Sequence, residues 1–524
     1  MNAPEVGFIP SPAGSRSNDV KVAGMSSGDI LVHSNESCGG GPGGFEIYNV
    51  DDPTNPMFLA SVRIDELNPI SDALFGGITD VGVHNLFLFT QDGDDDDDDD
   101  GRDYVAAVAE SAFDTYRVYD ITDPGNPTMV AAWGAEEVFD PGVGDETADV
   151  GRVLDAALWL LGGFGASQNR FLHDITITPE GTHAFLANWD AGLILLDQSD
   201  ITDPQLVSVA LDPTSEDGEV KSHAVWFTEP PDDDDDDDPW VVIEGEEDFA
   251  PFEIQFTIDT GPNAGSYPAA EGAFTIPIAS LPGQQMSGPT TYVGLACNSS
   301  PPVPAAGGSG QVALIQRGAC RFDEKATNAI NAGYDAMVVF NDAARGDALV
   351  TMGGDSRNIP GVFVGHSTGL TLMNVADAGQ LIIGAAGETA TASAIPNGWS
   401  GFRIWDYADP NNPVLASTFN TVCSANPIDP ICDPNGTYSA HNVIVEDDLA
   451  YISWYWDGVL VLDISDPYNP VEEARFSDDS AAFQAQNGGP QDVWGIYKVP
   501  DEDGIYASDR NGGLYVLQLG DNDD

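Results

Sequence analysis

Residues 440–470 read AHNVIVEDDLAYISWYWDGVLVLDISDPYNP, and this stretch decides the fold. Its runs of β-branched and aromatic residues predict three short strands, HNVIV, AYISWYW and GVLVLDIS. Asp466 and Pro467 then predict a turn, because proline has no N–H to give to a strand ladder and aspartate hydrogen-bonds nearby backbone. The same unit recurs, in varied form, along the whole chain.

The third strand of the unit and its turn occur as GFEIYNVDDPTNP (44–56), TYRVYDITDPGNP (115–127), GLILLDQSDITDP (192–204), GFRIWDYADPNNP (401–413), GVLVLDISDPYNP (458–470) and, without the turn, GGLYVLQLG (512–520). The first strand recurs at 18–24, 84–90, 173–179, 223–229, 441–447 and 491–499. Most of the turns are followed by a fourth strand. Six four-stranded units predict a mainly β protein, a six-bladed β-propeller. We expect residues 5–10, EVGFIP, to supply the last blade's fourth strand and close the ring, which would protect the sheet edges.

Blade four is interrupted between its second and third strands by residues 251–395, which are enough for a separate core. VALIQRG and AMVVFN are continuous apolar runs, as buried strands are, and a helix is expected from about residue 322 to 332. The segment resembles the protease-associated (PA) domain, and the matching residues are Gly318, Cys320, Phe322, Glu324, Lys325, Ala332, Gly333, Asn341, Ile359, Pro360 and Val362. The resemblance implies an inserted α/β module without catalytic residues, which contacts proteins or controls access to a neighbouring site.

The propeller repeats resemble LVIVD-repeat proteins, including the choice-of-anchor group of exported surface proteins. The resemblance is carried by the GLxVLDISDPxxP elements and by first strands that begin with His-Asn. The predicted organisation is therefore blades one to three and the first part of blade four in 1–250, the PA-like domain in 251–395, and the remaining blades in 396–524.

The excess of acidic over basic residues limits which kinds of molecule this protein can bind. The chain has 17 basic and 86 acidic residues and a net charge of −69, so nucleic acid and anionic membranes are repelled. No apolar run is long enough for a transmembrane helix, and the start has no leader pattern, so we expect the leader of an exported protein to have been removed. The acidity suits either high salt or divalent cations such as calcium. The aspartate runs from Asp94 to Asp100 and from Asp232 to Asp238 are expected at hairpin tips between first and second strands. They are either solvated tips or cation-binding loops.

The chain has five cysteines. Cys297 and Cys320 flank one irregular segment, and Cys423 and Cys432 flank a proline-rich loop, so each pair is expected to form a disulfide. Cys38 is left over. Two disulfides indicate an oxidising compartment, which agrees with an extracellular or cell-surface location.

Four of the seven histidines, His84, His173, His223 and His441, occupy the same position in the repeat. The first strand of a propeller blade is innermost, so these side chains are expected to surround the mouth of the central channel. They are candidate ligands for zinc, copper or iron, and Asp19, Asp174 and Asp492 are candidate ligands or second-shell acceptors. The alternatives are a structural role, in which each ring nitrogen holds a backbone carbonyl of the neighbouring blade, and a metal-free binding site.

The sequence has no HExxH or Walker A motif, and no catalytic residue is assigned. The favoured function is an exported, non-enzymatic binding or structural protein. Its recognition face would be formed by the PA domain and the top loops of the propeller, for a protein or surface glycan partner or for self-assembly. The alternative is a metal-dependent enzyme or metal-binding propeller that uses the histidines at the channel, with the PA domain gating access. The candidate cofactors are calcium and a transition metal.

Overall fold

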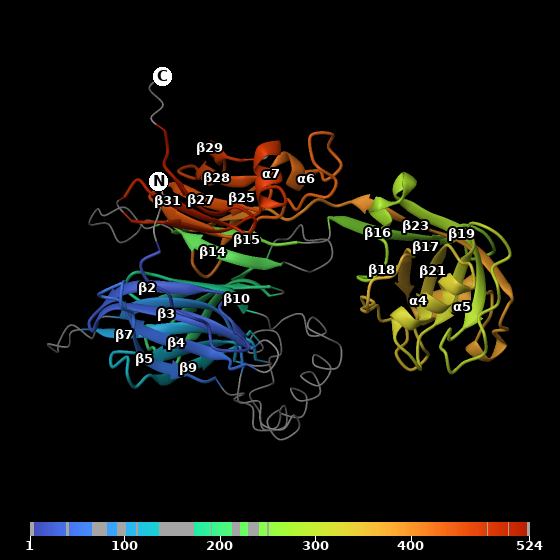
Figure 1. The fold of residues 1–524 in the computed structure, drawn as a ribbon, viewed down its shortest axis with the longest axis horizontal. Coiled ribbons are helices and arrows are strands. Elements are labelled where there is room, and N and C mark those ends of the chain that lie inside the picture. The colour runs from blue at the N-terminus through green and yellow to red at the C-terminus, as the bar shows by residue number, and fades with distance from the viewer. Residues whose placement is uncertain are drawn as a thin grey trace. The chain divides into compact units, whose positions relative to one another are not determined.

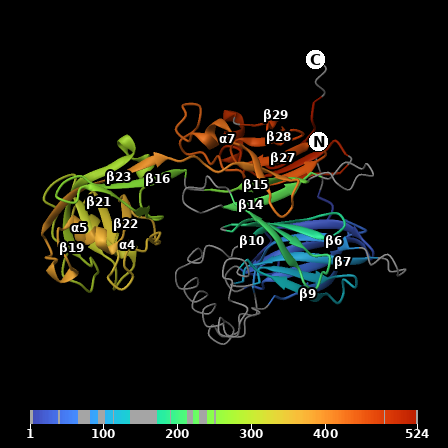
Figure 2. The same cartoon turned by 180° about the vertical axis from the view of Figure 1, so that it is seen from behind.

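The computed structural model describes residues 5–520, apart from 38–40, 65–80, 92–100, 112–113, 136–171, 190, 212–220, 229–239, 249–250, 479 and 501. The chain forms two compact units (Figures 1 and 2). Unit 1 contains Met1–Phe249, Trp399–Ala425 and Asp429–Asp524, and unit 2 contains Ala250–Gly398 and Asn426–Ile428. The domain boundaries predicted at 250/251 and 395/396 lie close to the points where the chain passes between the units.

Unit 1 is built from six antiparallel sheets that follow one another in the sequence, which confirms the six-bladed arrangement. Blade one contains β1 (Ser15–Arg16), β2 (Val20–Met25), β3 (Gly28–Ser37), β4 (Gly44–Asn49) and β5 (Met57–Val62). Blade two contains β6 (Val83–Gln91), β7 (Arg102–Ala109), β8 (Tyr116–Asp120) and β9 (Thr128–Trp133). Blade three contains β10 (Leu172–Ile177), β11 (His183–Asn188), β12 (Gly192–Asp197) and β13 (Gln205–Ala210). Blade four contains β14 (Ser222–Phe227), β15 (Trp240–Glu246), β24 (Phe402–Tyr407) and β25 (Val414–Phe419). Blade five contains β26 (Val443–Glu446), β27 (Leu449–Trp454), β28 (Gly458–Asp463) and β29 (Val471–Phe476). Blade six contains β30 (Val493–Lys498), β31 (Ile505–Asp509) and β32 (Gly513–Leu517).

The cores of unit 1 lie between neighbouring blades. Because side chains alternate across a strand, each blade supplies one face to the blade before it and the other to the blade after it. In β12, Leu196 packs into the core shared by blades two and three, whereas Leu195 packs into the core shared by blades three and four. No blade can bury both faces alone, so the folding of each blade depends on its neighbours.

The predicted ring closure by the N-terminal segment is not what the structure shows. Residues 5–10 form no strand, Gly7 lies against Pro53 and Pro56 of blade one, and the described sheet of blade six holds three strands. Pro10 and Pro12 offer a physical reason. Residues two apart in a strand direct their N–H groups to the same edge, so two prolines at this spacing remove neighbouring donors from it.

Unit 2 is an α/β domain with one mixed sheet, whose strand order is β17-β16-β23-β19-β20-β21-β22-β18. Its elements are β16 (Phe252–Ile258), β17 (Gly265–Tyr267), β18 (Ala269–Glu271), β19 (Gln285–Gly294), β20 (Val312–Gln316), α4 (Phe322–Asn331), β21 (Ala336–Phe340), β22 (Gly361–Val364), α5 (His366–Leu372) and β23 (Ala386–Pro396). Strands β19 to β22 are parallel, and their alternate side chains fill two cores, one on each face of the sheet. The helix expected near residues 322–332 is α4.

Both predicted disulfides are present, Cys297–Cys320 in unit 2 and Cys423–Cys432 in unit 1. Cys38 and both aspartate runs lie outside the described residues. The strands that flank the runs, β6 with β7 and β14 with β15, are first and second strands of their blades, as expected. Among the described helices, none is long and apolar enough to span a membrane.

Candidate functional site

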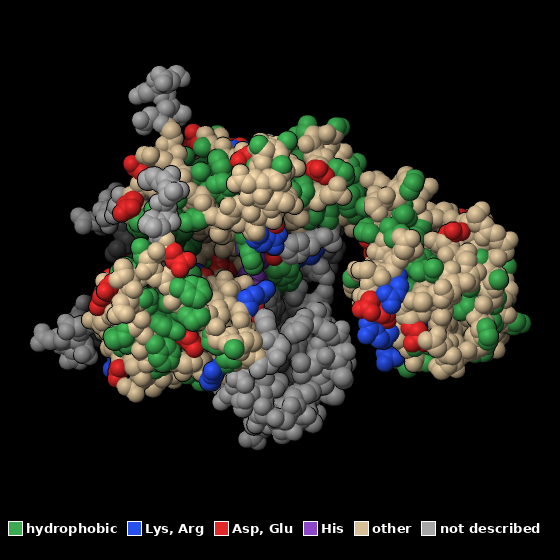
Figure 3. Space-filling view, viewed as in Figure 1, with side chains coloured by type: hydrophobic (Ala, Val, Ile, Leu, Met, Phe, Trp, Pro, Cys, Tyr) green, Lys and Arg blue, Asp and Glu red, His purple; other side chains and the backbone are tan. Residues whose placement is uncertain are grey.

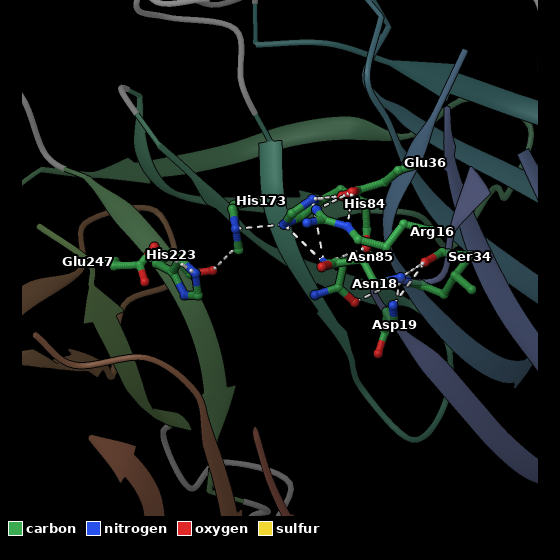
Figure 4. A network of polar contacts seen from close by, with 11 residues as sticks. Arg16, Asn18, Asp19, Ser34, Glu36, His84, Asn85, His173, His223 and Glu247 are labelled. Carbon is green, nitrogen blue, oxygen red and sulfur yellow. Dashed lines mark hydrogen bonds and ion pairs between the residues drawn. The ribbon is translucent and has the colours of Figure 1, made fainter. Parts of the chain in front are cut away.

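The structure brings the four histidines of the repeat together in a row across blades two to five. The ring centroids are 4.3 Å apart for His84 and His173, 3.7 Å for His173 and His223, and 4.4 Å for His223 and His441. Figure 4 shows the first three of them. His173, His223 and His441 are buried, and His84 is partly buried.

A β-bulge at the start of the inner strand accompanies three of these histidines. The register of the inner pair of strands skips between Val83 and Leu86 in blade two, between Leu172 and Asp174 in blade three, and between Ser222 and Ala224 in blade four. A bulge leaves a residue unpaired and re-aims its side chain. This local geometry frees the rings from the ladder, so that they turn toward the neighbouring blades.

The residue at this position joins its blade to the next one. His173 Nδ1 donates to the carbonyl of His223 (2.8 Å), and His223 Nδ1 donates to the carbonyl of His441 (3.1 Å). Asn18, which stands in this position in blade one, donates from Nδ2 to the carbonyl of His84 (3.1 Å). This is the structural role that the sequence left open, and we call the contact the blade clasp. The clasp fixes the Nδ1–H tautomer of His173 and His223, so that Nε2 is left as an acceptor or ligand.

The three aspartates predicted as second-shell acceptors have other described partners. Asp19 Oδ2 accepts from Leu86 N in the next blade (2.9 Å), and Asp174 Oδ2 accepts from Val225 N in the next blade (3.3 Å). Asp492 pairs with Arg510 (2.7 Å). Two of these carboxylates therefore form a second link between blades, parallel to the clasp, rather than orienting a histidine ring.

The carboxylates that meet the histidine rings come from a position that the sequence analysis did not single out. Where the second strand of a blade ends, the chain places Glu36, Glu110, Trp189, Glu247, Tyr455 and Arg510 in blades one to six. Each lies one or two residues beyond the residue paired with the start of the third strand, so the register of the third strand could have located the set. Only three of the six residues are glutamate, and the other three are of different types, so the sequence shows no repeat at this position.

At one end of the row, His84 lies between a glutamate and a histidine. His84 Nδ1 is 2.6 Å from Glu36 Oε1, and His84 Nε2 is 2.8 Å from His173 Nε2 (Figure 4). Burial alone would raise the pKa of Glu36, but His84 and Arg16 outweigh it and hold this pKa below its usual range. Because the clasp makes His173 Nε2 an acceptor and the Glu36 carboxylate also accepts, the two short contacts make His84 the donor to both. We call Glu36, His84 and His173 the protonated half of the row.

At the other end, two histidines face one glutamate. His223 Nε2 lies 3.2 Å from Glu247 Oε2, and His441 Nε2 lies 3.8 Å from Glu247 Oε1, which also accepts from the hydroxyl of Tyr455. Burial, reinforced by the neighbouring histidines, lowers the pKa of His223 and His441 well below the usual value. Burial also raises the pKa of Glu247 to about 7. We call His223, Glu247 and His441 the acceptor half.

The donor types in the row are those of transition-metal sites. Imidazole nitrogen and carboxylate oxygen suit zinc, iron, cobalt and manganese, and a ligating histidine usually donates its other N–H to a carbonyl or carboxylate. Two groups bring a potential ligand atom from each of three residues within 4.8 Å of one another: His223, Glu247 and His441, and Glu36, His84 and Glu110.

Comparisons with known families agree with this architecture. The PA domain model matches residues 286–372, and the LVIVD repeat model matches residues 175–211 and 439–478, in blades three and five. The chain is thus a β-propeller that carries LVIVD repeats, with a PA domain inserted in blade four.

The individual similar proteins match short parts of the chain or match it loosely. The E3 ubiquitin-protein ligase Godzilla of Drosophila melanogaster is 45% identical over 64 residues, 12% of each chain, and the E3 ubiquitin-protein ligase RNF149 of Xenopus laevis is 38% identical over 63 residues, 12% of this chain and 16% of the relative. A zinc aminopeptidase of Bacillus subtilis overlaps 32% of this chain and 36% of its own, with 21% identity and a TM-score of 0.23. Sqt1 of Chaetomium thermophilum overlaps 94% of this chain and 81% of its own, with 10% identity and a TM-score of 0.35. These similarities carry no argument about function.

Proposed function

We propose that this chain is an exported, non-enzymatic binding protein of the cell surface or the extracellular space, in which the PA domain is the recognition module and the propeller is its support. PA domains and LVIVD repeats both suggest a surface or extracellular role in protein interaction, and the two disulfides suit an oxidising compartment.

The observation that carries the proposal is the way unit 2 is inserted. β15 and β24 are paired antiparallel neighbours in blade four, with Gly245 opposite Phe402. Topologically, the whole domain therefore replaces a hairpin loop and adds nothing to the ladder of the blade. Unit 2 also has its own two cores and its own disulfide. A self-contained module in a surface loop is typical of recognition rather than of scaffold stability.

Unit 2 carries exposed arginines in a chain with few basic residues. The side chains of Arg321 and Arg345 are 69% and 58% exposed, and each pairs with an aspartate, Asp323 at 3.0 Å and Asp342 respectively. Figure 3 shows basic and acidic side chains gathered along one edge of this unit. Such a mixed-charge edge can select a partner by electrostatic complementarity despite the net charge of −69.

The test uses a variant in which residues 251–396 are replaced by a short Gly/Ser loop, which the pairing of β15 with β24 permits. We expect the full chain to be cleaved by protease added to intact producing cells, and the labelled protein to bind the surface of those cells. The variant should retain the propeller's melting transition and lose at least about tenfold in binding, since only the recognition module is gone. Protection from external protease, or equal binding by the variant, would contradict the proposal. Self-association or glycan binding would identify a different partner class.

A second function, a metal-binding propeller, is favoured by one specific observation, the buried cluster of imidazoles and carboxylates in unit 1. Metal binding does not require the PA domain to act on the same ligand, so the two functions are compatible.

A further inference from the structure

The two halves of the histidine row compensate their buried carboxylates and nitrogen lone pairs in different ways. Buried carboxylates and imidazole nitrogens need a proton or a cation between them, because facing lone pairs repel in a medium of low dielectric constant. In the protonated half, His84 supplies protons to both sides, and Arg16 Nε adds a hydrogen bond to Glu36 (2.8 Å).

Within the part of the chain that the structure describes, the acceptor half has no lysine or arginine paired with its carboxylate. The clasp uses the Nδ1–H of His223, so its Nε2 faces Glu247 as a lone pair. Among the described residues, the ion-pair contacts of Glu247 are those with His223 and His441. Arg510 stacks over Tyr455 (4.8 Å to the ring centroid) and is paired with Asp492.

The distances also separate the halves. Two ligand atoms that each lie about 2.1 Å from a tetrahedral metal are roughly 3.4 Å apart. The 3.2 Å between His223 Nε2 and Glu247 Oε2 and the 3.8 Å between His441 Nε2 and Glu247 Oε1 bracket this value. The 2.8 Å between His84 Nε2 and His173 Nε2 is instead the length of a hydrogen bond.

The surroundings of the acceptor half complete the arrangement that metal sites show. The carbonyl of His441 holds His223 in the tautomer that exposes Nε2, and the hydroxyl of Tyr455 holds one oxygen of Glu247. All three potential ligands are buried, so an ion bound there would interact with them in a low dielectric medium.

We propose that His223 Nε2, His441 Nε2 and the Glu247 carboxylate bind one divalent transition metal ion between blades four and five. Two histidines and one glutamate leave at least one coordination position for water or for a ligand. The site is distinct from the even ring of four histidines expected from the sequence, because His84 and His173 belong to the protonated half. This inference rests on the second proposed function and is independent of cell-surface binding by the PA domain.

The experiment is a titration of the full chain with Co²⁺, after dialysis against EDTA and removal of the chelator, followed by visible absorption and calorimetry. We expect one tightly bound ion with the ligand-field absorption of a low-coordinate site, displaced by Zn²⁺. Glu247→Gln keeps the shape of the side chain and its contact with Tyr455, and His441→Ala leaves the clasp donor of His223 in place. Each should weaken Co²⁺ binding by about 100-fold or more.

The matched control is His183→Ala, because His183 lies in β11 outside the row and pairs with the hydroxyl of Thr182 (3.1 Å). It should bind Co²⁺ like the unchanged protein. The aspartate runs are present in every variant, so weak binding to them cancels in the comparison. Absence of saturable binding in the unchanged protein, unchanged affinity in both Glu247→Gln and His441→Ala, or equal loss in His183→Ala would each overturn the proposal. If His441→Ala unfolds, Glu247→Gln alone decides. The surface-binding test with the loop variant is unaffected by any of these results.

Discussion

The protonated half and the acceptor half of the histidine row are built from the same repeat position, yet they handle buried charge in opposite ways. In the first, His84 is held by hydrogen bonds between Glu36 and His173. In the second, burial keeps His223 and His441 neutral, and Glu247 faces both. The comparison teaches that a repeated residue need not repeat its chemistry, because its surroundings differ from blade to blade. Glu36 meets a histidine of the next blade and also accepts from Arg16, whereas Glu247 meets a histidine of its own blade and one of the next.

The largest expected effect is a difference in sign between two matched substitutions. Glu36→Gln removes the carboxylate that accepts from the partly buried His84 and from Arg16, and we expect the free energy of unfolding to fall by about 3 kcal/mol. Glu247→Gln in the metal-free protein removes a carboxylate that burial disfavours, so above pH 7 stability should hold or rise by about 1 kcal/mol. Urea unfolding of the propeller in EDTA measures both. Equal losses would erase the distinction between the halves.

The pH dependence of stability sharpens the same comparison. Burial raises the pKa of Glu247 from 4.5 to about 7, so the folded protein keeps a proton that the unfolded chain has lost. Stability from this group is therefore present at low pH and is lost as pH rises from about 4.5 through 7, by up to roughly 3 kcal/mol. Glu36 has a lowered pKa, so its contribution has the opposite sign and is lost as pH falls. The lowered pKa values of His173, His223 and His441 make stability rise with pH up to about 6.5, against the contribution of Glu247. The Glu247 contribution is therefore measured as a difference: in EDTA, the stability of the unchanged protein relative to Glu247→Gln should fall as pH rises from about 5 to 8.

The clasp is common to both halves and can be separated from the charges. Asn18 shows that an asparagine can fill the clasp position, since it donates to the carbonyl of His84. His173→Asn should therefore be more stable than His173→Ala by about 1 kcal/mol, the usual value of one buried hydrogen bond. Thermal melting of the two variants side by side tests this. Indistinguishable melting temperatures would remove the clasp as a source of stability.

The smallest effect is expected at the exposed edge of the protonated half. Arg16 pairs with Glu36, but the arginine side chain is 57% exposed, so solvent screens the pair. Arg16→Gln should cost about 0.5 kcal/mol, and less in high salt. A loss as large as that of Glu36→Gln would mean that the arginine, rather than His84, is the main partner of the carboxylate.

The fold could be predicted from the sequence because its signals are local and repeated. Strands such as GVLVLDIS and turns such as Asp466 with Pro467 occur in nearly every blade, and the PA motif around Cys320 and Lys325 is specific. The register of the histidines was visible for the same reason.

The carboxylate partners were not predictable in the same way. The ends of the second strands read NES, VAE, NWD, GEE, WYW and SDR in blades one to six, and no residue type is common to all six segments. Which of them meets a histidine depends on the bulges and on the angle between neighbouring blades, and both are properties of tertiary structure. The prediction that residues 5–10 form the closing strand was wrong for a related reason. A short apolar segment such as EVGFIP has a sequence compatible with a strand whether or not a partner edge is available.

The three clasps of blades one, three and four share a direction, because each runs from one blade to the carbonyl of the blade that follows it, whereas Gln491 at the same position in blade six donates back to the carbonyl of Trp456 in blade five (2.8 Å). Asn18 reaches blade two, His173 reaches blade four, and His223 reaches blade five. A blade thus stabilises its successor, which makes unit 1 a chain of nearest-neighbour couplings. In such a chain, a defect is felt first by the adjacent repeat, and folding that proceeds from the N-terminus adds each new blade to a template that already presents its donor.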